Sequence, residues 1–137
     1  MLDFLFKKAK LSVDMERILN IHIEAGVLNV YDVILGWCLC GKYEDMKKNR
    51  GLLGQYLISN QKQIKKLSSQ LLLIPEVGTS IGFIGAWDYI TEVISENKYN
   101  KLRKNPPSAE DVDKICRDIS VLVIKEVKEF MKLNELL

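Results

Sequence analysis

The sequence predicts an all-α fold, a compact bundle of five or six helices that ends in a long carboxy-terminal helix. Apolar residues recur at spacings of three and four along most of the chain, which is the period of one helix face. Residue types that favour helix starts precede several of these segments. The 137 residues include 47% hydrophobic and 28% charged residues, an ordinary globular composition that excludes a disordered chain. We find no internal repeat and no long linker, so we expect a single helical domain over residues 1–137.

The first half of the chain is expected to hold three helices. The first covers residues 2–10, and the second begins after Ser12 and stops at Gly26, a residue type common just past helix ends. The third is expected over residues 30–46. Because residues 30–40 are nearly all apolar and rich in Val and Ile, a buried strand is the alternative for that stretch.

The second half is expected to hold two more helices before the last one. Apolar residues at helical spacing predict a helix over residues 52–73, ended by Pro75. A further helix is expected to start at residue 79 or 80 and to reach residue 97. Residues 96–107 are polar and basic and are interpreted as a connection.

The last helix has the clearest predicted boundaries. Ser108 is a preferred N-cap residue, and Asp111 occupies the position of the reciprocal partner in a capping box. Apolar residues then follow at helical spacing, so we expect a helix over residues 109–134.

Charge and cysteine content favour a cytoplasmic protein with free thiols. Twenty Lys and Arg against 18 Asp and Glu give a net charge of +2. The three cysteines, Cys38, Cys40 and Cys116, are an odd set at irregular spacing, which is unsuited to a disulfide framework. Residues 1–10 place apolar residues before basic ones, the reverse of a secretory signal. The longest apolar stretch, residues 71–90, is interrupted by a proline and two acidic residues, so we do not expect integral membrane insertion.

No catalytic set is apparent in the sequence. His22 is the one histidine, and it falls within the apolar stripe of the second predicted helix, so we interpret it as structural. No recognisable nucleophile motif is present. Asp88 and Glu92 stand one helical turn apart, a spacing interpreted as solvated helix surface.

Metal and cofactor sites are likewise not expected. On a helix, Cys38 and Cys40 would point about 200° apart and would not share a metal ion. The glycines at 78, 82 and 85 match neither a dinucleotide fingerprint nor a P-loop, so we interpret them as close helix packing.

Basic residues concentrate in the middle of the chain, with 11 of the 20 between residues 42 and 104. Tyr43, Tyr56 and Tyr99 are interleaved with them, as in proteins that stack on single-stranded nucleic acid. If the clusters converge, they would contact several phosphates. The candidate nucleic-acid-binding residues are Lys47, Lys48, Arg50, Lys62, Lys65, Lys66, Lys101, Arg103 and Lys104, with Lys98 beside the last cluster.

One segment resembles the R-x4–6-H motif of HEPN ribonucleases, which are small helical bundles. The motif residues are Arg17 and His22, and NPPSAEDVDKI (residues 105–115) resembles the start of the final HEPN helix. This sequence has Ile18 where the family commonly has Asn. The resemblance implies RNA binding or cleavage, with Arg17 and His22 as the catalytic pair across a homodimer.

We therefore expect a non-enzymatic helical module that binds another protein or a second copy of itself, as adaptors, inhibitors and immunity-type proteins do. The alternative is the RNA-binding or ribonuclease module of HEPN-like type. A third hypothesis is a peripheral membrane protein anchored through Leu2–Lys10, where aromatic and aliphatic side chains precede lysines.

Overall fold

The computed structural model describes residues 10–30, 33, 36, 43–48 and 51–137. Within these residues the chain is helical and contains no strand, which confirms the predicted all-α class. Residues 2–9 of the helix predicted over 2–10 lie outside the described residues, as do Cys38, Cys40 and Arg50, and residue 10 is not helical. A helix was predicted over residues 30–46, with a strand as the alternative over 30–40; residue 30 is a turn, and the described residues 33, 36 and 43–46 are helical. The described helices are α2 (Val13–Asn29), α4 (Tyr43–Lys47), α5 (Leu52–Ser59), α6 (Gln61–Lys65), α7 (Leu73–Val93), α8 (Glu96–Lys104) and α9 (Ala109–Leu133).

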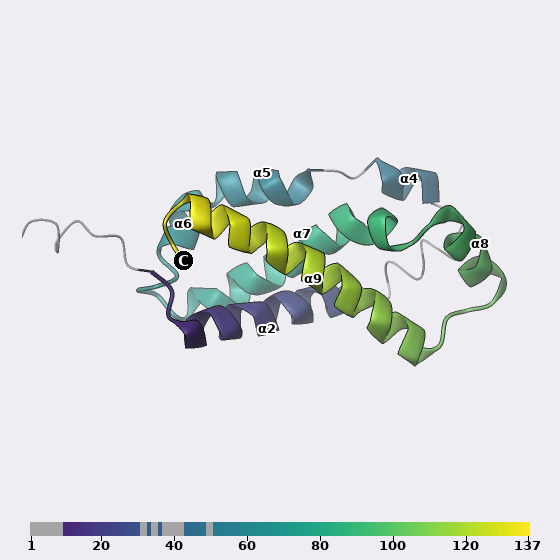
Figure 1. Cartoon of the computed structure of the whole chain (residues 1–137), viewed down its shortest axis with the longest axis horizontal. Coiled ribbons are helices and arrows are strands. Elements are labelled where there is room, and N and C mark those ends of the chain that lie inside the picture. The colour runs from purple at the N-terminus through teal and green to yellow at the C-terminus, as the bar shows by residue number, and fades with distance from the viewer. Residues whose placement is uncertain (1–9, 31–32, 34–35, 37–42, 49–50) are drawn as a thin grey trace, which may run out of the picture.

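Three long helices, α2, α7 and α9, pack against one another along the long axis of the molecule (Figure 1). Helices α4 and α5 pack on α7 as well. The short helices α6 and α8 lie at opposite ends, with α6 beside the end of α9 (Figure 1). The core between the long helices is aliphatic and includes Leu19, Ile23, Ile81, Ile119 and Val123, all almost fully buried.

Glycines allow the closest of these helix contacts. A Cβ atom at Gly26 would overlap the carbonyl oxygen of Thr79, and one at Gly82 would overlap that of Ile23. At Gly78 an added Cβ would lie 2.7 Å from the Cβ of His22. The interpretation of Gly78, Gly82 and Gly85 as packing residues is confirmed, and Gly85 faces Val123 of α9.

Helix α9 begins as predicted. The Ser108 hydroxyl accepts a hydrogen bond from the Asp111 amide (3.1 Å), and the Asp111 carboxylate accepts one from the Ser108 amide (3.4 Å). This reciprocal pair satisfies two amides that have no partner within the helix. The capping box is confirmed, and the helix extends to Leu133.

The predicted end of the second helix and the predicted helix over residues 52–73 are wrong. Helix α2 continues through Gly26 to Asn29 because that glycine serves close packing and not termination. The segment 52–73 is divided at Asn60, whose side-chain amide donates to the Tyr56 carbonyl. The backbone of Asn60 departs from helical geometry there (φ −108°, ψ 20°), and turns follow over residues 66–69 and 71–72.

The predictions around Pro75 and the polar connection are also wrong. Pro75 lies in the first turn of α7, where its missing amide hydrogen has no helical partner to lose. Helix α7 therefore starts at Leu73 and not at residue 79 or 80, and it ends at Val93. The connection predicted for 96–107 is mostly helix α8, capped by the Ser95 hydroxyl, which accepts from the Lys98 amide (3.2 Å).

Asp88 differs most from its predicted role. It was expected on a solvated surface, yet it is 6% exposed. Its two carboxylate oxygens accept hydrogen bonds from the amides of Leu52 (3.0 Å) and Leu53 (2.8 Å), at the start of α5. A carboxylate at this place satisfies amides that Gly51, the N-cap residue without a side chain, leaves unpaired.

Across the residues that the structure describes, no helix is long and apolar enough to span a bilayer.

Candidate interaction groove

A groove of about 520 Å³ lies between α2 and α9. Helix α2 contributes Glu24 and Leu28 to it, one turn apart on the same side of the helix. Helix α9 contributes a stripe at helical spacing: Asp113, Cys116, Arg117, Ser120, Val121 and Ile124.

The walls of the groove expose apolar side chains to solvent. Val121 of α9 is 67% exposed and Leu28 of α2 is 50% exposed. Ile21 extends the exposed apolar surface along the same side of α2, since it stands one turn before Glu24. Such a surface is unfavourable in water unless another apolar surface covers it.

The two groups in the groove that resemble nucleophiles are both held in unreactive states. Cys116 is buried, and burial raises the pKa of its thiol, with the nearby Asp113 carboxylate raising it further. The thiol therefore stays protonated at neutral pH. The Ser120 hydroxyl donates to the Cys116 carbonyl (2.8 Å), a bond within its own helix. Neither of these two groups in the groove is an activated nucleophile.

Charged residues form the rim of the groove. Glu24 and Asp113 supply two carboxylates and Arg117 one cation, all three exposed. The Arg117 Nε donates to the Asp113 carbonyl of its own helix (3.4 Å). Among the described residues, no cluster of His, Cys, Asp and Glu is suited to a metal ion.

Sequence reasoning missed the groove residues Leu28 and Val121. The available signal was their position on the helix: Val121 falls outside the stripe formed by Ile115, Ile119 and Val123. An apolar residue on the polar side of a long helix is an exposed apolar residue once the helix packs.

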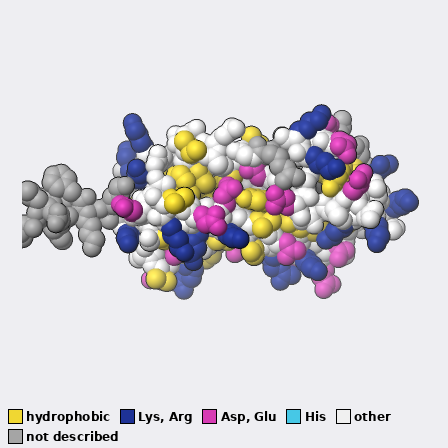
Figure 2. Space-filling model, turned by 45° about the horizontal axis from the view of Figure 1, so that its top comes forward, with side chains coloured by type: hydrophobic (Ala, Val, Ile, Leu, Met, Phe, Trp, Pro, Cys, Tyr) yellow, Lys and Arg dark blue, Asp and Glu magenta, His cyan; other side chains and the backbone are white. Residues whose placement is uncertain are grey.

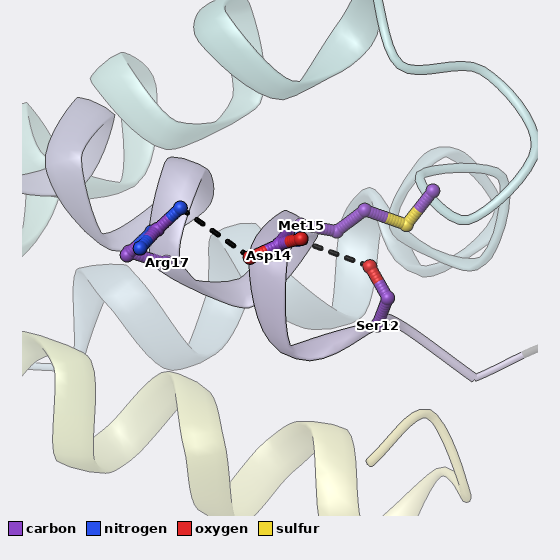
Figure 3. Close-up of polar contacts among 4 residues, drawn as sticks. All are labelled: Ser12, Asp14, Met15 and Arg17. Carbon is purple, nitrogen blue, oxygen red and sulfur yellow. Dashed lines mark hydrogen bonds and ion pairs between the residues drawn. The ribbon is translucent and has the colours of Figure 1, made fainter.

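Arg17 and His22 lie on different sides of α2. Arg17 is exposed and forms an ion pair with Asp14 (3.3 Å), while the hydroxyl of Ser12 caps the same turn by accepting from the Met15 amide (Figure 3). His22 is half-buried, with its Cβ against Gly78 of α7. Five residues of helix turn the two side chains about 140° apart. Within one chain they do not form a joint site.

The basic clusters separate into two groups at opposite ends of the molecule. Helices α4 and α8, with Lys47, Lys48, Lys98, Lys101, Arg103 and Lys104, lie near one end, and α6, with Lys62, Lys65 and Lys66, lies at the other (Figure 1). Figure 2 shows dark blue side chains at both ends of the elongated body. At the α4 end, Lys47 pairs with Glu44 (3.5 Å) and Lys48 with Asp45 (3.8 Å).

The tyrosines near these clusters are mostly packed inside. Tyr43 and Tyr99 are buried against each other, with ring centroids 4.9 Å apart, and the Tyr43 hydroxyl donates to the Ile94 carbonyl. Tyr56 is half-buried, and burial raises the pKa of its hydroxyl. Tyr43 and Tyr99 join α4 to α8 and are not exposed for stacking on bases.

No protein-family profile, curated protein or solved structure matches this chain. The HEPN resemblance therefore stays a prediction that depends on residues 17–22 and 105–115.

Proposed function

We propose that the protein is a non-enzymatic interaction module that binds an amphipathic helix of a partner protein in the α2–α9 groove. The observation that carries this proposal is the exposure of Leu28 and Val121 on facing walls of one groove. A third helix laid between two packed helices covers such walls with residues at positions i, i+3 and i+7. The groove volume, about 520 Å³, suits a small number of large side chains.

The chemistry of the groove supports binding over catalysis. Its thiol and hydroxyl are both held in unreactive states, and its rim offers carboxylates for orientation. We expect the partner helix to have one apolar face and at least one Lys or Arg beside it, because Glu24 and Asp113 stand on opposite walls.

A photo-crosslinking amino acid tests this proposal in the cells that produce the protein. Placed at Val121 it should give a discrete adduct, and the adduct should disappear when Leu28→Asp is added. The matched control position is Phe83, an exposed apolar residue of α7 away from the groove. An adduct of twice the chain mass would identify self-association. Identical adducts from both positions, or none from Val121, would contradict the proposal.

RNA binding is the second candidate, favoured by the meeting of α4 and α8 at one end. Lys101, Arg103 and Lys104 on α8 are exposed there beside Lys47 and Lys48. Fluorescence anisotropy with RNA at low and near-physiological salt tests it, since phosphate contacts weaken steeply with salt. Binding lost in the variant K101E/R103E/K104E would support this second function, and no binding at low salt would dismiss it.

A further inference from the structure

The end of the molecule that contains α6 combines the most exposed leucine of the described chain with lysines. Leu72 is 94% exposed, and Leu71 beside it is more than half exposed. Both lie in the turn that joins α6 to α7. Lys62, Lys65 and Lys66 are exposed immediately before this turn. We call these five residues the leucine–lysine patch.

The turn holds the two leucines outward by its own hydrogen bonds. The Gln70 amide donates to the Lys66 carbonyl (2.8 Å), and the Leu73 and Ile74 amides donate to the carbonyls of Gln70 and Leu71 (3.0 and 3.1 Å). Leu67 and Ile74 on either side are fully buried. Buried residues thus fix both ends of the turn, and the leucines between them form its tip.

Other exposed apolar residues lie at the same end. Leu133 at the end of α9 is 84% exposed, and Val13 at the start of α2 is 82% exposed. The Leu11 amide donates to the Leu136 carbonyl (3.0 Å), and the Gln61 side chain donates to Asn134, so α2, α6 and the end of α9 meet here (Figure 1). The three most exposed of the large hydrophobic residues that the structure describes therefore lie at one end.

The segment that carries the patch is basic, and the exposed carboxylates at this end, Asp14, Glu76 and Glu135, come from the flanking helix ends. Between Gly51 and Pro75 the chain holds three lysines and no acidic residue. This differs from α4, where each of the two lysines is ion-paired with an acidic neighbour. Leucines that project into solvent beside exposed lysines match the chemistry of an anionic lipid surface, with acyl chains for the leucines and phosphates for the lysines.

We propose that the leucine–lysine patch docks the protein on anionic membranes, with Leu71 and Leu72 inserted at the boundary between headgroups and acyl chains. RNA or an acidic protein would use the lysines and would leave the leucines unoccupied. The contribution of the leucines therefore distinguishes a lipid surface from other polyanions. This docking site is separate from the α2–α9 groove and does not depend on it.

Co-sedimentation of the full chain with vesicles tests the proposal. The vesicles contain phosphatidylcholine with phosphatidylglycerol, and the comparison vesicles contain phosphatidylcholine alone. We expect binding to the anionic vesicles only, weakened about hundredfold by L71S/L72S and by at least about hundredfold in K62E/K65E/K66E. These side chains are exposed, so the variants should fold, which circular dichroism checks.

Matched controls remove general charge and apolar effects. The variant K101E/R103E/K104E carries the same charge change at the other end, and V121S loses an exposed apolar residue elsewhere; both should bind as the wild type does. In L72W, brominated lipids should quench the added fluorescence above the background of the native tryptophans. Deletion of residues 1–9 tests the alternative anchor and should leave binding sensitive to L71S/L72S.

Three outcomes would overturn the proposal. The first is absence of binding to anionic vesicles. The second is binding that the leucine variant leaves unchanged, whether or not residues 1–9 are needed. The third is equal loss in the two charge-reversal variants, because that would show attraction without a defined surface.

Discussion

Helix α7 is held on two sides by contacts of opposite kind. On the side of α2, Gly26, Gly78 and Gly82 form a glycine seam in which backbone meets backbone and an added methyl group has no space. On the side of α5, the contact depends on one buried carboxylate, Asp88, which satisfies two amides. The contact with α2 requires that these glycines have no Cβ atom, whereas the contact with α5 requires the two carboxylate oxygens of Asp88. The two sides should therefore fail under different substitutions.

The largest effect is expected from the glycine seam. In Gly82→Ala the new Cβ would overlap the Ile23 carbonyl oxygen and lie 2.9 Å from the Gly26 Cα. Both are backbone atoms, so the helices must separate. We expect a loss of about 3 kcal/mol in the free energy of unfolding, measured by urea denaturation, despite the better helix propensity of Ala. Unchanged stability would show that α2 and α7 pack less closely than described.

The junction with α5 should give the next largest effect. Asp88→Ala leaves the amides of Leu52 and Leu53 without their acceptor, and the side chain of Leu53 is fully buried. We expect a loss of about 2 kcal/mol by urea denaturation, and a smaller one for Asp88→Asn, which keeps one carbonyl oxygen. Amide exchange should speed up in α5 before it does in α2. Uniform acceleration in both helices would contradict a local cap.

These two contacts also show what a sequence can and cannot reveal. The packing role of Gly78, Gly82 and Gly85 was predictable, because a helix that is apolar on most sides and carries glycines at spacings of three and four must approach its neighbours closely. The role of Asp88 was not, since its partners lie 35 and 36 residues away and only the fold brings them together. Local spacing with Glu92 favoured the wrong interpretation.

For helix boundaries and for the candidate site as well, features that depend on residues near in sequence were predictable, and features that depend on the fold were not. Ser108 and Asp111 define the start of α9 through contacts three residues apart, so that start was predictable. Pro75 lies in the first turn of α7, and because a proline fits that position as well as the one after a helix, the sequence alone does not determine which end of a helix it marks. The groove depends on which sides of α2 and α9 face each other, which the apolar pattern of either helix alone does not determine.

A third contact of α7 is sensitive to pH. The Tyr89 hydroxyl donates to Glu126 Oε1 of α9 (2.7 Å), and burial together with that carboxylate raises the pKa of Tyr89. Because the folded pKa exceeds the unfolded value near ~10, this tyrosine contributes stability below that pH and the contribution is lost as pH rises further. We expect Tyr89→Phe to cost about 1 kcal/mol at neutral pH and less above about pH 10. Urea denaturation at both pH values measures this, and a difference that grows with pH would reverse the assigned sign.

The smallest effect on stability is expected for a glycine outside the glycine seam. Gly54 lies inside α5, and a Cβ there would meet no atom within 4 Å. Since the backbone is helical and the space is open, Gly54→Ala should stabilise the protein by about 0.5–1 kcal/mol through helix propensity alone. The same chemical change thus has opposite signs at Gly82 and Gly54. If urea denaturation showed equal losses of stability in the two variants, the loss would come from replacing a glycine in any helix, and close packing at the glycine seam would not be its cause.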